Sequence, residues 1–313
     1  MARLAVVAVG GNALIRDAGH QSIPDQCVAA AAACGQIAAM VARGWQIVLT
    51  HGNGPQVGFI QRRAELALSE LPPVPLDHCG AASQGDIGYI LQRALGNELR
   101  KRGCRRQVVS LVTQTLVQRD DPAFANPTKP IGSFMDAAVA RRRGEEEGWQ
   151  VGEDAGRGWR RMVPSPLPRR IVELDVIRTL VRAGAIVICL GGGGIPVCEN
   201  EAGELEGLEA VIDKDRASSL LARGLRADLF LITTGVEKVA LRYNQPGETW
   251  LDRLTLAEAR RLLGEGHFPP GSMGPKIEAA VGYLESGGRE VLITSPDSLA
   301  RALRGETGTR ITA

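Results

Sequence analysis

Residues 4–14 read LAVVAVGGNAL, and this stretch predicts the fold. The run 4–9 is apolar throughout and rich in valine, which is typical of a parallel strand buried on both faces. It ends at Gly10-Gly11, a pair that allows a tight turn. Helices and strands are then expected to alternate, as a helix over 24–42, a strand over 46–50, helices over 55–69 and 86–102, and a strand over 107–113. This order predicts a mostly parallel sheet covered by helices on both faces.

The alternation stops over about 119–168 and then resumes. This segment holds prolines, glycines, two tryptophans and the charge runs 141–143 and 145–147, which we expect to face solvent. It shows little helical periodicity and one or two strand-like pieces, so we expect a small excursion from the sheet. Later elements are expected as a helix over 170–182, a strand over 185–190, a hairpin over 196–213, a helix over 216–223, a strand over 229–233, helices over 256–263 and 275–286, a strand over 290–294, a helix over 297–304 and a strand over 308–312.

Composition excludes several classes of protein. The 313 residues carry a net charge of only +2 and 4% aromatic residues, which argues against a nucleic-acid partner. No run approaches 18 consecutive apolar residues, so no membrane span or membrane partner is expected. The six cysteines show no CxxC spacing, which indicates free thiols rather than disulfides or a metal site. We therefore expect a cytoplasmic protein.

Four predicted strands run into turns that carry glycine or threonine. These turns are Gly10-Gly11-Asn12, Gly52-Asn53-Gly54, the glycine run 191–194 and Thr233-Thr234-Gly235. The carboxyl ends of parallel strands share one edge of a sheet, where glycine lets backbone N–H groups approach an anion. The four turns together favour a phosphate-handling site, although a tight strand–helix turn needs glycine for geometry alone.

Known phosphate-binding motifs fit poorly. The P-loop pattern GxxxxGK[ST] and the protein-kinase motifs are absent. Gly52, Gly54 and Gly58 follow a predicted strand, and their spacing partly matches the glycine-rich motif of dinucleotide-binding proteins. That alternative needs an acidic residue at the end of the next strand, and the sequence there, 111–114, has none.

Lysine is rare in this chain, and its positions are informative. Only five of the 37 basic residues are lysines, and Lys129, Lys214 and Lys276 lie next to glycine, proline or aspartate. Phosphoryl transfer needs compact cations around the moving group, a role for which lysine and arginine are not interchangeable. Asp213 and Asp215 flank Lys214. One would orient the lysines and the other cap the following helix; an N-cap with surface salt bridges is the alternative.

These turns and lysines resemble the motifs of the carbamate kinases, enzymes of the amino acid kinase superfamily. The similar stretches are 10–14, 51–58, 126–132, 153–154, 156–161, 191–197, 209–215 and 271–276. They span essentially the whole chain in the family's order. Ser133 and Met135 are small departures, because the family more often has Pro and Tyr there.

The resemblance implies a three-layer αβα sandwich around a mostly parallel sheet of about eight strands, in a single domain over 1–313. An N-terminal lobe, about 1–210, would hold carbamate and carbamoyl phosphate, and a C-terminal lobe, about 211–313, the nucleotide. The segment 119–168 would form a protruding subdomain, and two copies a homodimer. The implied reaction is reversible phosphoryl transfer between ATP and carbamate, with Mg²⁺, giving ADP and carbamoyl phosphate. The family often runs it toward ATP in arginine or agmatine breakdown.

The resemblance also implies roles for individual residues. Lys214 and Lys276 would neutralise the moving phosphoryl group, Asp215 would hold both lysines, and Lys129 would reach in from the subdomain. Substrate would be cradled by Gly10, Gly11, Asn12, Gly52, Asn53 and Gly54, with Arg161 as a further candidate. The nucleotide would contact Gly191, Gly192, Asp213, Thr233, Gly235 and Met273. Lys214 would supply the charge that most superfamily members place at the position of Asn12. No metal ligand is expected from the protein, because nucleotide phosphates would hold Mg²⁺.

Several other polar residues leave alternatives open. His51 would be redundant as a base, because carbamate is already an anion, and is expected to orient its loop. Arg157, Arg160 and Arg161 surround Trp159 and would either attract an anionic substrate or pair with the acids at 153–154. Gln84 and Asp86, near a predicted helix start, are expected in capping or dimer contacts.

Two other functions remain in competition with this one. A kinase acting on another small carboxylate is disfavoured by Asn12 and the 213–215 motif. A silent paralogue that only binds carbamoyl phosphate or nucleotide is disfavoured by intact Lys214, Asp215 and Lys276.

Overall fold

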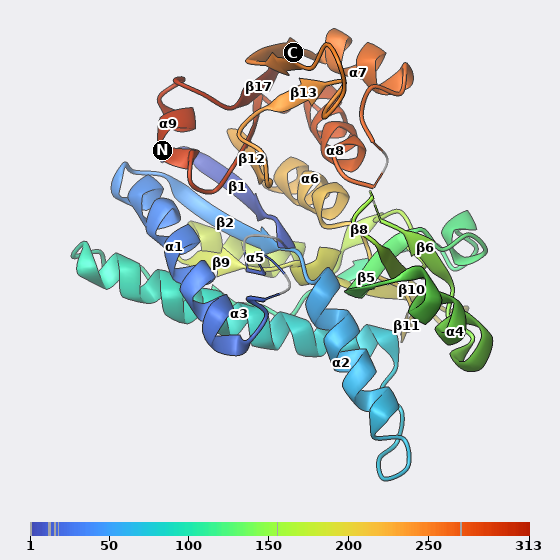
Figure 1. Cartoon of the computed structure of the whole chain (residues 1–313). Coiled ribbons are helices and arrows are strands. Elements are labelled where there is room, and N and C mark those ends of the chain that lie inside the picture. Colours follow the sequence, from blue (N-terminus) through green and yellow to red (C-terminus); the bar gives the residue numbers. More distant parts are fainter. Residues whose placement is uncertain (1, 12–13, 16, 18, 155, 270) are drawn as a thin grey trace.

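The computed structural model describes residues 2–11, 14–15, 17, 19–154, 156–269 and 271–313 (Figure 1). Its centre is an eight-stranded sheet, in which β17 and β15 run opposite to the six other strands. The strands across the sheet are β15 (Arg253–Thr255), β17 (Thr309–Thr312), β16 (Glu290–Thr294), β12 (Leu229–Thr233), β1 (Leu4–Val9), β2 (Gln46–His51), β9 (Ile186–Ile188) and β3 (Val108–Ser110). The predicted mostly parallel sheet is therefore confirmed.

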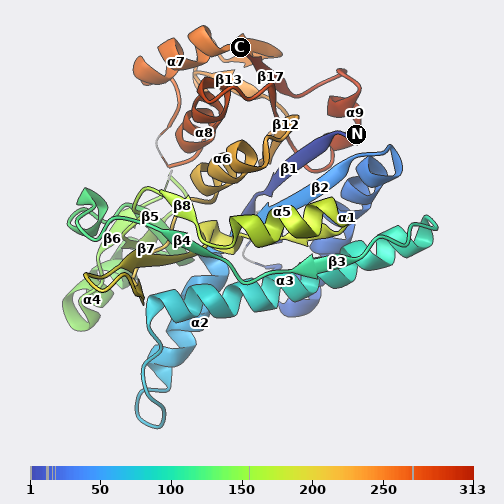
Figure 2. The same cartoon turned by 180° about the vertical axis from the view of Figure 1, so that it is seen from behind.

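Alternation along β1 divides the core into two layers. Val6 and Ala8 pack in one cluster, whereas Ala5, Val7 and Val9 pack in the other. The helices that pack with the first cluster are α5 (Leu174–Arg182), α6 (Lys214–Leu225), α7 (Leu256–Gly264) and α8 (Gly274–Glu285). Those that pack with the second are α1 (Ile23–Ala42), α3 (Leu76–Lys101) and α9 (Leu299–Leu303). Figures 1 and 2 show these helices on opposite faces of the sheet, which confirms the three-layer sandwich.

Smaller sheets lie beside the carboxyl edge of the large one (Figure 1). The segment 119–168 contains η2 (Pro122–Phe124), β5 (Lys129–Met135), α4 (Ala137–Glu147), β6 (Val151–Glu153) and β7 (Trp159–Val163), with the strands in the order β5-β7-β6. A four-stranded sheet has the order β11 (Leu205–Gly207), β10 (Ile195–Glu199), β4 (Gln114–Leu116) and β8 (Arg170–Ile171). The remaining elements are α2 (Gly54–Leu66), η3 (Gly191–Gly193) and the hairpin of β13 (Val239–Leu241) with β14 (Thr249–Leu251).

Two helices correct the sequence analysis. The segment expected to lack helical periodicity contains α4, which starts at an Asp136 cap and ends at Gly148 in the left-handed conformation. Its eleven residues are mostly charged, so no apolar periodicity marks it. Helix α3 begins ten residues before the predicted start, because small residues such as Gly80 and Ser83 hide its buried face in the sequence. Gln84 consequently lies inside the helix and caps nothing.

Helix α1 is the one described helix whose length and composition would allow it to cross a membrane, with a mean hydropathy of 1.3. Half of that window is buried inside the protein, and its buried residues Ala30, Cys34 and Ile37 belong to the second core layer. A buried core helix of this composition accounts for the signal equally well, so it is weak evidence for a membrane segment. All six cysteines are free, as expected.

His51 ends β2 as a buried imidazole at the carboxyl edge of the sheet. Its Nδ1 lies 3.1 Å from the Gly52 carbonyl oxygen, and its ring takes the space over Gly191, where a Cβ would lie 2.5 Å away. Burial lowers the pKa of His51 to about 4, and the charge of Lys214 acts in the same direction. His51 is therefore neutral at pH 7 and separates two turns, which fits the expected orienting role.

This buried histidine predicts a dependence of stability on pH. Between pH 6.5 and 4 the unfolded chain protonates His51 and the folded protein does not, so the free energy of unfolding falls as the pH is lowered through this window. From pH 7 to 5 the wild type should lose about 2 kcal/mol more than His51→Gln. Urea titrations of both proteins at the two pH values measure the difference. An equal pH dependence would show that His51 has the same pKa in the folded and unfolded states, and would contradict its burial as a neutral group.

Candidate active site

The four glycine turns meet at the carboxyl edge of the sheet. The Gly10 amide donates to Oγ1 of Thr233 over 3.2 Å, which joins the ends of β1 and β12. A Cβ on Gly52 would lie 3.0 Å from the Gly11 nitrogen, and one on Gly192 would lie 2.1 Å from the Asn53 amide. Only glycine fits such close approaches, so these glycines are required for the turns to assemble.

Gln84 ties one of these turns to α3. Its Nε2 donates to the carbonyl oxygens of Thr113 and Gly191, and its Oε1 accepts from the Thr113 amide. Nothing in the local sequence marks this role, because the partners are separated from Gln84 by 29 and 107 residues. Gln84 is a buried anchor of the glycine turn, not the capping or dimer contact expected from the sequence.

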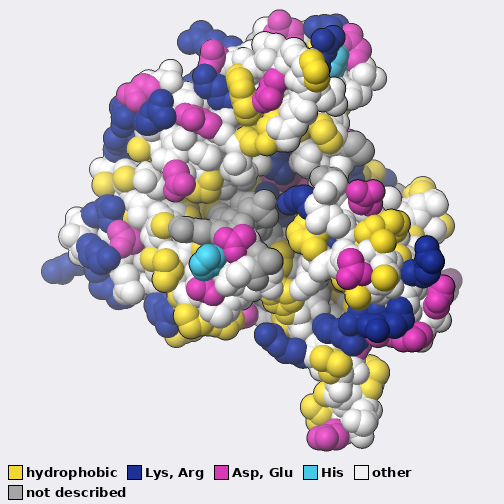
Figure 3. All heavy atoms as spheres, viewed as in Figure 1, with side chains coloured by type: hydrophobic (Ala, Val, Ile, Leu, Met, Phe, Trp, Pro, Cys, Tyr) yellow, Lys and Arg dark blue, Asp and Glu magenta, His cyan; other side chains and the backbone are white. Residues whose placement is uncertain are grey.

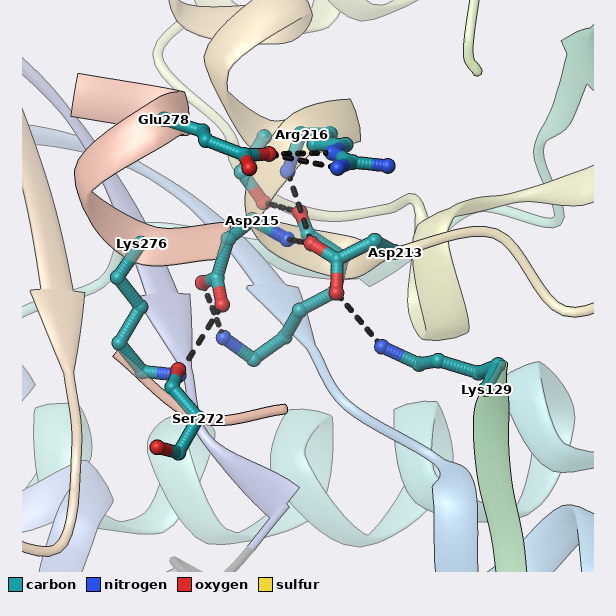
Figure 4. Close-up of polar contacts among 9 residues, drawn as sticks. Lys129, Asp213, Asp215, Arg216, Ser272, Lys276 and Glu278 are labelled. Atoms are coloured by element: carbon teal, nitrogen blue, oxygen red, sulfur yellow. Dashed lines mark hydrogen bonds and ion pairs between the residues drawn. The ribbon is translucent and has the colours of Figure 1, made fainter. Parts of the chain in front are cut away.

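Asp213 caps helix α6 and also holds a lysine from the segment 119–168. Its Oδ1 accepts from the backbone amides of Asp215 and Arg216, at 2.9 and 3.1 Å, so the predicted capping role is confirmed. Its Oδ2 accepts from Lys129 Nζ at 2.6 Å. Figure 4 shows Lys129 approaching this carboxylate from strand β5. Asp213 therefore connects α6 to β5.

Asp215 binds the two other lysines through its two oxygens. Lys214 Nζ lies 2.5 Å from Oδ1, and Lys276 Nζ lies 3.3 Å from Oδ2 (Figure 4). Lys276 lies in the first turn of α8, and its Nζ also donates to the Ser272 carbonyl oxygen at 3.1 Å. One carboxylate thus gathers two cations that lie 62 residues apart in the sequence.

Burial and charge act in opposite directions at these groups. Lys214 and Asp215 are only 8% and 3% exposed. Burial lowers the pKa of Lys214, and the like charge of Lys276 adds to this effect. Burial alone would raise the pKa of Asp215, but the two lysines outweigh it and hold that pKa below its ordinary value. Burial would lower the pKa of Lys276, yet Asp215 and then Asp213 raise it.

The cluster carries a surplus of positive charge. Lys129, Lys214 and Lys276 face two carboxylates, Asp213 and Asp215, while Arg216 is neutralised by Glu278 at 2.6 Å. The Cδ of Lys214 lies 3.5 Å from the position of a Cβ on Gly52, so the cluster adjoins the glycine turns. Figure 3 shows a hollow on this face, between the C-terminal part and the segment 119–168, with Lys and Arg side chains beside it. Such an arrangement can neutralise a small anion that carries a phosphoryl group.

The predicted residues are only partly brought together. Gly10, Gly11, Gly52, Asn53, Gly191, Gly192 and Thr233 lie in the joined turns. Met273 precedes α8, and Gly235 is exposed after β12. Arg161 turns away: it pairs with Glu65 at 2.5 Å, and its guanidinium lies 4.7 Å from the centre of the Trp149 ring. Asn12 is outside the described residues.

The acids here do not fit a metal site held by the protein. Both oxygens of Asp215 and one of Asp213 accept from lysines, and the second oxygen of Asp213 accepts from two amides. No group of three or more His, Cys, Asp or Glu side chains suitable for a metal occurs in the described ranges.

Comparison with known proteins agrees with this geometry. Carbamate kinase-like protein YahI of Escherichia coli is 50% identical to the chain, over 99% of each protein. Carbamate kinase of Pyrococcus horikoshii is 48% identical, over 98% of each. Structures of carbamate kinase from Giardia lamblia bound to citric acid or to AMP-PNP superpose with TM-scores of 0.94 and 0.89, at 40% and 42% identity. Each covers 99% of this chain and 98% of the Giardia chain.

A family model gives the broader classification. The model of the amino acid kinase family matches residues 3–295, which include every strand of the large sheet except β17. The full-length relatives and the glycine and lysine arrangement agree with this match. The chain therefore belongs to the amino acid kinase family.

Proposed function

We propose that the protein is a carbamate kinase, which transfers a phosphoryl group reversibly between ATP and carbamate. The observation that carries the proposal is the pairing of Lys214 and Lys276 on one carboxylate, beside glycine turns that leave room for a small anion. Full-length relatives named carbamate kinase, at 48% identity, support the choice of acceptor.

The proposed reaction toward ATP proceeds by direct displacement. A terminal phosphate oxygen of ADP attacks the phosphorus of carbamoyl phosphate, and the bond from phosphorus to the carbamoyl oxygen breaks. The electron pair of that bond stays on the departing carbamate, so no proton needs to move. Lys214 and Lys276 neutralise the oxygens of the moving group, and Asp215 keeps them in place. A neutral, buried His51 is compatible with this chemistry, which needs no base.

In this proposal the nucleotide binds on the C-terminal side of the lysine cluster. Thr233 ends β12, Gly235 follows two residues later, and Met273 directly precedes α8, the helix that carries Lys276. The AMP-PNP complex of the Giardia carbamate kinase supports ATP as the partner substrate. Because Asp213 and Asp215 are occupied by lysines, Mg²⁺ would take its ligands from the nucleotide phosphates, where it neutralises part of their charge.

We also propose a functional division of the chain. Residues 1–210 hold the carbamate side, residues 211–313 hold the nucleotide, and the subdomain 119–168 covers the site. Three features support the covering role: the Lys129–Asp213 ion pair, the 3.4 Å approach of the Pro130 carbonyl oxygen to the position of a Cβ on Gly54, and the close packing of Gly58 on Gly132.

The proposal extends to assembly and location. A homodimer is supported by the edge strand β3, whose neighbours Tyr89 and Val112 are 59% and 56% exposed. The free cysteines support a reducing compartment such as the cytoplasm. Production of ATP from carbamoyl phosphate in arginine or agmatine breakdown is the proposed direction.

A related kinase with another small acid as acceptor is the second candidate. It is favoured by one observation, the 50% identity to a protein described only as carbamate kinase-like. The same cluster would serve it, because Lys214 and Lys276 contact the phosphoryl group and not the acid.

The proposed activity predicts ATP formation from Mg-ADP and carbamoyl phosphate. Lys214→Ala should lower kcat by about 100-fold or more, because it removes a buried cation from the phosphoryl group. A luciferase assay of ATP measures both proteins, with acetyl phosphate as the competing donor. Absence of ATP above the Lys214→Ala background would refute the proposal, and faster turnover of acetyl phosphate would support the second candidate.

The shape of the cation at position 276 gives another prediction. Lys276→Arg keeps the charge, but its planar fork does not fit a point-charge site between Asp215 and the Ser272 carbonyl oxygen. The expected kcat is lower by at least about ten-fold. Lys101→Arg on the exposed end of α3 is the matched control and should be unaffected. Near wild-type turnover of Lys276→Arg would show that Lys276 does not contact the phosphoryl group.

A further inference from the structure

Arg160 is a buried cation, and one nitrogen of its guanidinium, Nη2, makes no hydrogen bond to the described residues. We call Nη2 the unused arm. Arg160 is 8% exposed and makes two hydrogen bonds, from Nε to the Gly132 carbonyl oxygen at 3.1 Å and from Nη1 to Asp154 at 3.0 Å. Its guanidinium also lies 5.1 Å from the centre of the Phe134 ring. The described part of the chain offers Nη2 no acceptor. Three of the five N–H donors of the guanidinium therefore remain, and two of them are on Nη2.

The unused arm faces the start of α2. Nη2 of Arg160 lies 3.7 Å from the position of a Cβ on Gly54, the first residue of that helix. The side chain of the preceding Asn53 makes no capping hydrogen bond to the helix, and its Nδ2 donates to Ser83 Oγ at 2.8 Å. Nη2 of Arg160 and the start of α2 thus lie close together, and among the described residues no carboxylate pairs with Nη2.

Arg160 and Lys214 stand at the two ends of one short turn. Lys214 Cδ lies 3.5 Å from the position of a Cβ on Gly52, and Gly54 is only two residues further on. Two residues span at most about 7 Å even when fully extended. Both cations therefore lie beside one turn, where a single small molecule with a phosphoryl group at one end and an acyl group at the other could contact both.

The positive charge around Arg160 is only partly neutralised by the protein. Asp154 is buried and accepts from both Arg160 and Arg157, so two guanidinium groups share one carboxylate. Burial lowers the pKa of Arg160, although Asp154 opposes this effect. A buried cation that is only partly neutralised is costly, and a bound anion would offset that cost.

We propose that Arg160 is a catalytic residue that binds the carbamate end of carbamoyl phosphate. This inference rests on the proposed function and adds a group that acts on the leaving atom. When the bond between phosphorus and the carbamoyl oxygen breaks, its electron pair becomes negative charge on carbamate, and Arg160 stabilises that charge through Nη2. In the reverse direction the same arm orients the carbamate oxygen that attacks ATP.

Strand alternation explains why Arg160 and not Arg161 has this position. Neighbouring residues of β7 point to opposite faces, so Arg161 reaches Glu65 and Trp149 while Arg160 reaches Gly54. Lys129 lies on the paired strand β5 and approaches Asp213. The register pairs Ile131 with Arg161, so Lys129 shares a face of this small sheet with Arg161, and Arg160 comes to Gly54 from the opposite face.

The experiment compares Arg160→Gln and Arg160→Lys with the matched control Arg157→Gln. All three keep a partner for Asp154, because either Arg157 or residue 160 remains cationic. Arg157 contacts the same carboxylate but is exposed, so its loss should change kcat less than about two-fold. Both Arg160 variants should lower kcat for ATP formation by about 100-fold with an unchanged KM for ADP. Thermal unfolding of each variant checks the fold.

Binding separates this inference from the proposed function. Calorimetric titration with carbamoyl phosphate, without nucleotide, should show at least ten-fold weaker binding to Arg160→Gln than to wild type. If the wild type binds carbamoyl phosphate but forms no ATP, the proposed function fails, while the Arg160 dependence of binding still tests this inference. If Arg160→Lys is folded and retains wild-type kcat and affinity, Arg160 does not contact the substrate. Should Arg160→Gln unfold, Arg160→Lys decides, because it keeps the charge opposite Asp154.

Discussion

The carboxylate of Asp215 is the constraint on which the rest of the site depends. The ammonium groups of Lys214 and Lys276, which are proposed to surround one phosphoryl group, repel each other, and burial adds to the cost of each charge. Asp215 offsets both effects, because each of its oxygens accepts from one lysine. Its place in the first turn of α6 adds the favourable end of the helix dipole. Asp215 thus holds together, without any substrate, the two lysines proposed to contact the phosphoryl group.

The parallel sheet is what makes this arrangement attainable. Strands β1, β2 and β12 end at the same edge, so residues as far apart in the sequence as Gly10 and Thr233, separated by 223 positions, meet there. The glycines act less as flexible residues than as space for neighbours: Gly10 admits the Thr233 carbonyl oxygen and Gly192 admits Asn53. The proposed site also includes Lys129 and Arg160, which lie outside the large sheet on the paired strands β5 and β7. Each cation therefore comes from a different element.

Sequence patterns predicted those parts whose signal is local. Strands β12 and β16 have the predicted bounds, because buried apolar runs with clear ends mark them. The Asp213 cap is also local, since its partners follow within three residues. Helix α4 and the start of α3 lack apolar periodicity, and the sequence did not reveal them. Whether Arg160 or Arg161 faces the site depends on how β7 pairs with β5. That pairing has an irregularity between Ile131 and Met135, which the local sequence does not predict.

A double-mutant cycle on kcat tests most directly whether Asp215 acts by holding the lysines. The variants are Asp215→Asn, Lys276→Ala and the two combined, each assayed for ATP formation at saturating ADP and carbamoyl phosphate. If Asp215 works through the lysines, the combined variant should lose no more than about ten-fold beyond Asp215→Asn alone, because residues acting as a unit are not additive. Losses that multiply would show that Asp215 and Lys276 act independently, and would contradict the account.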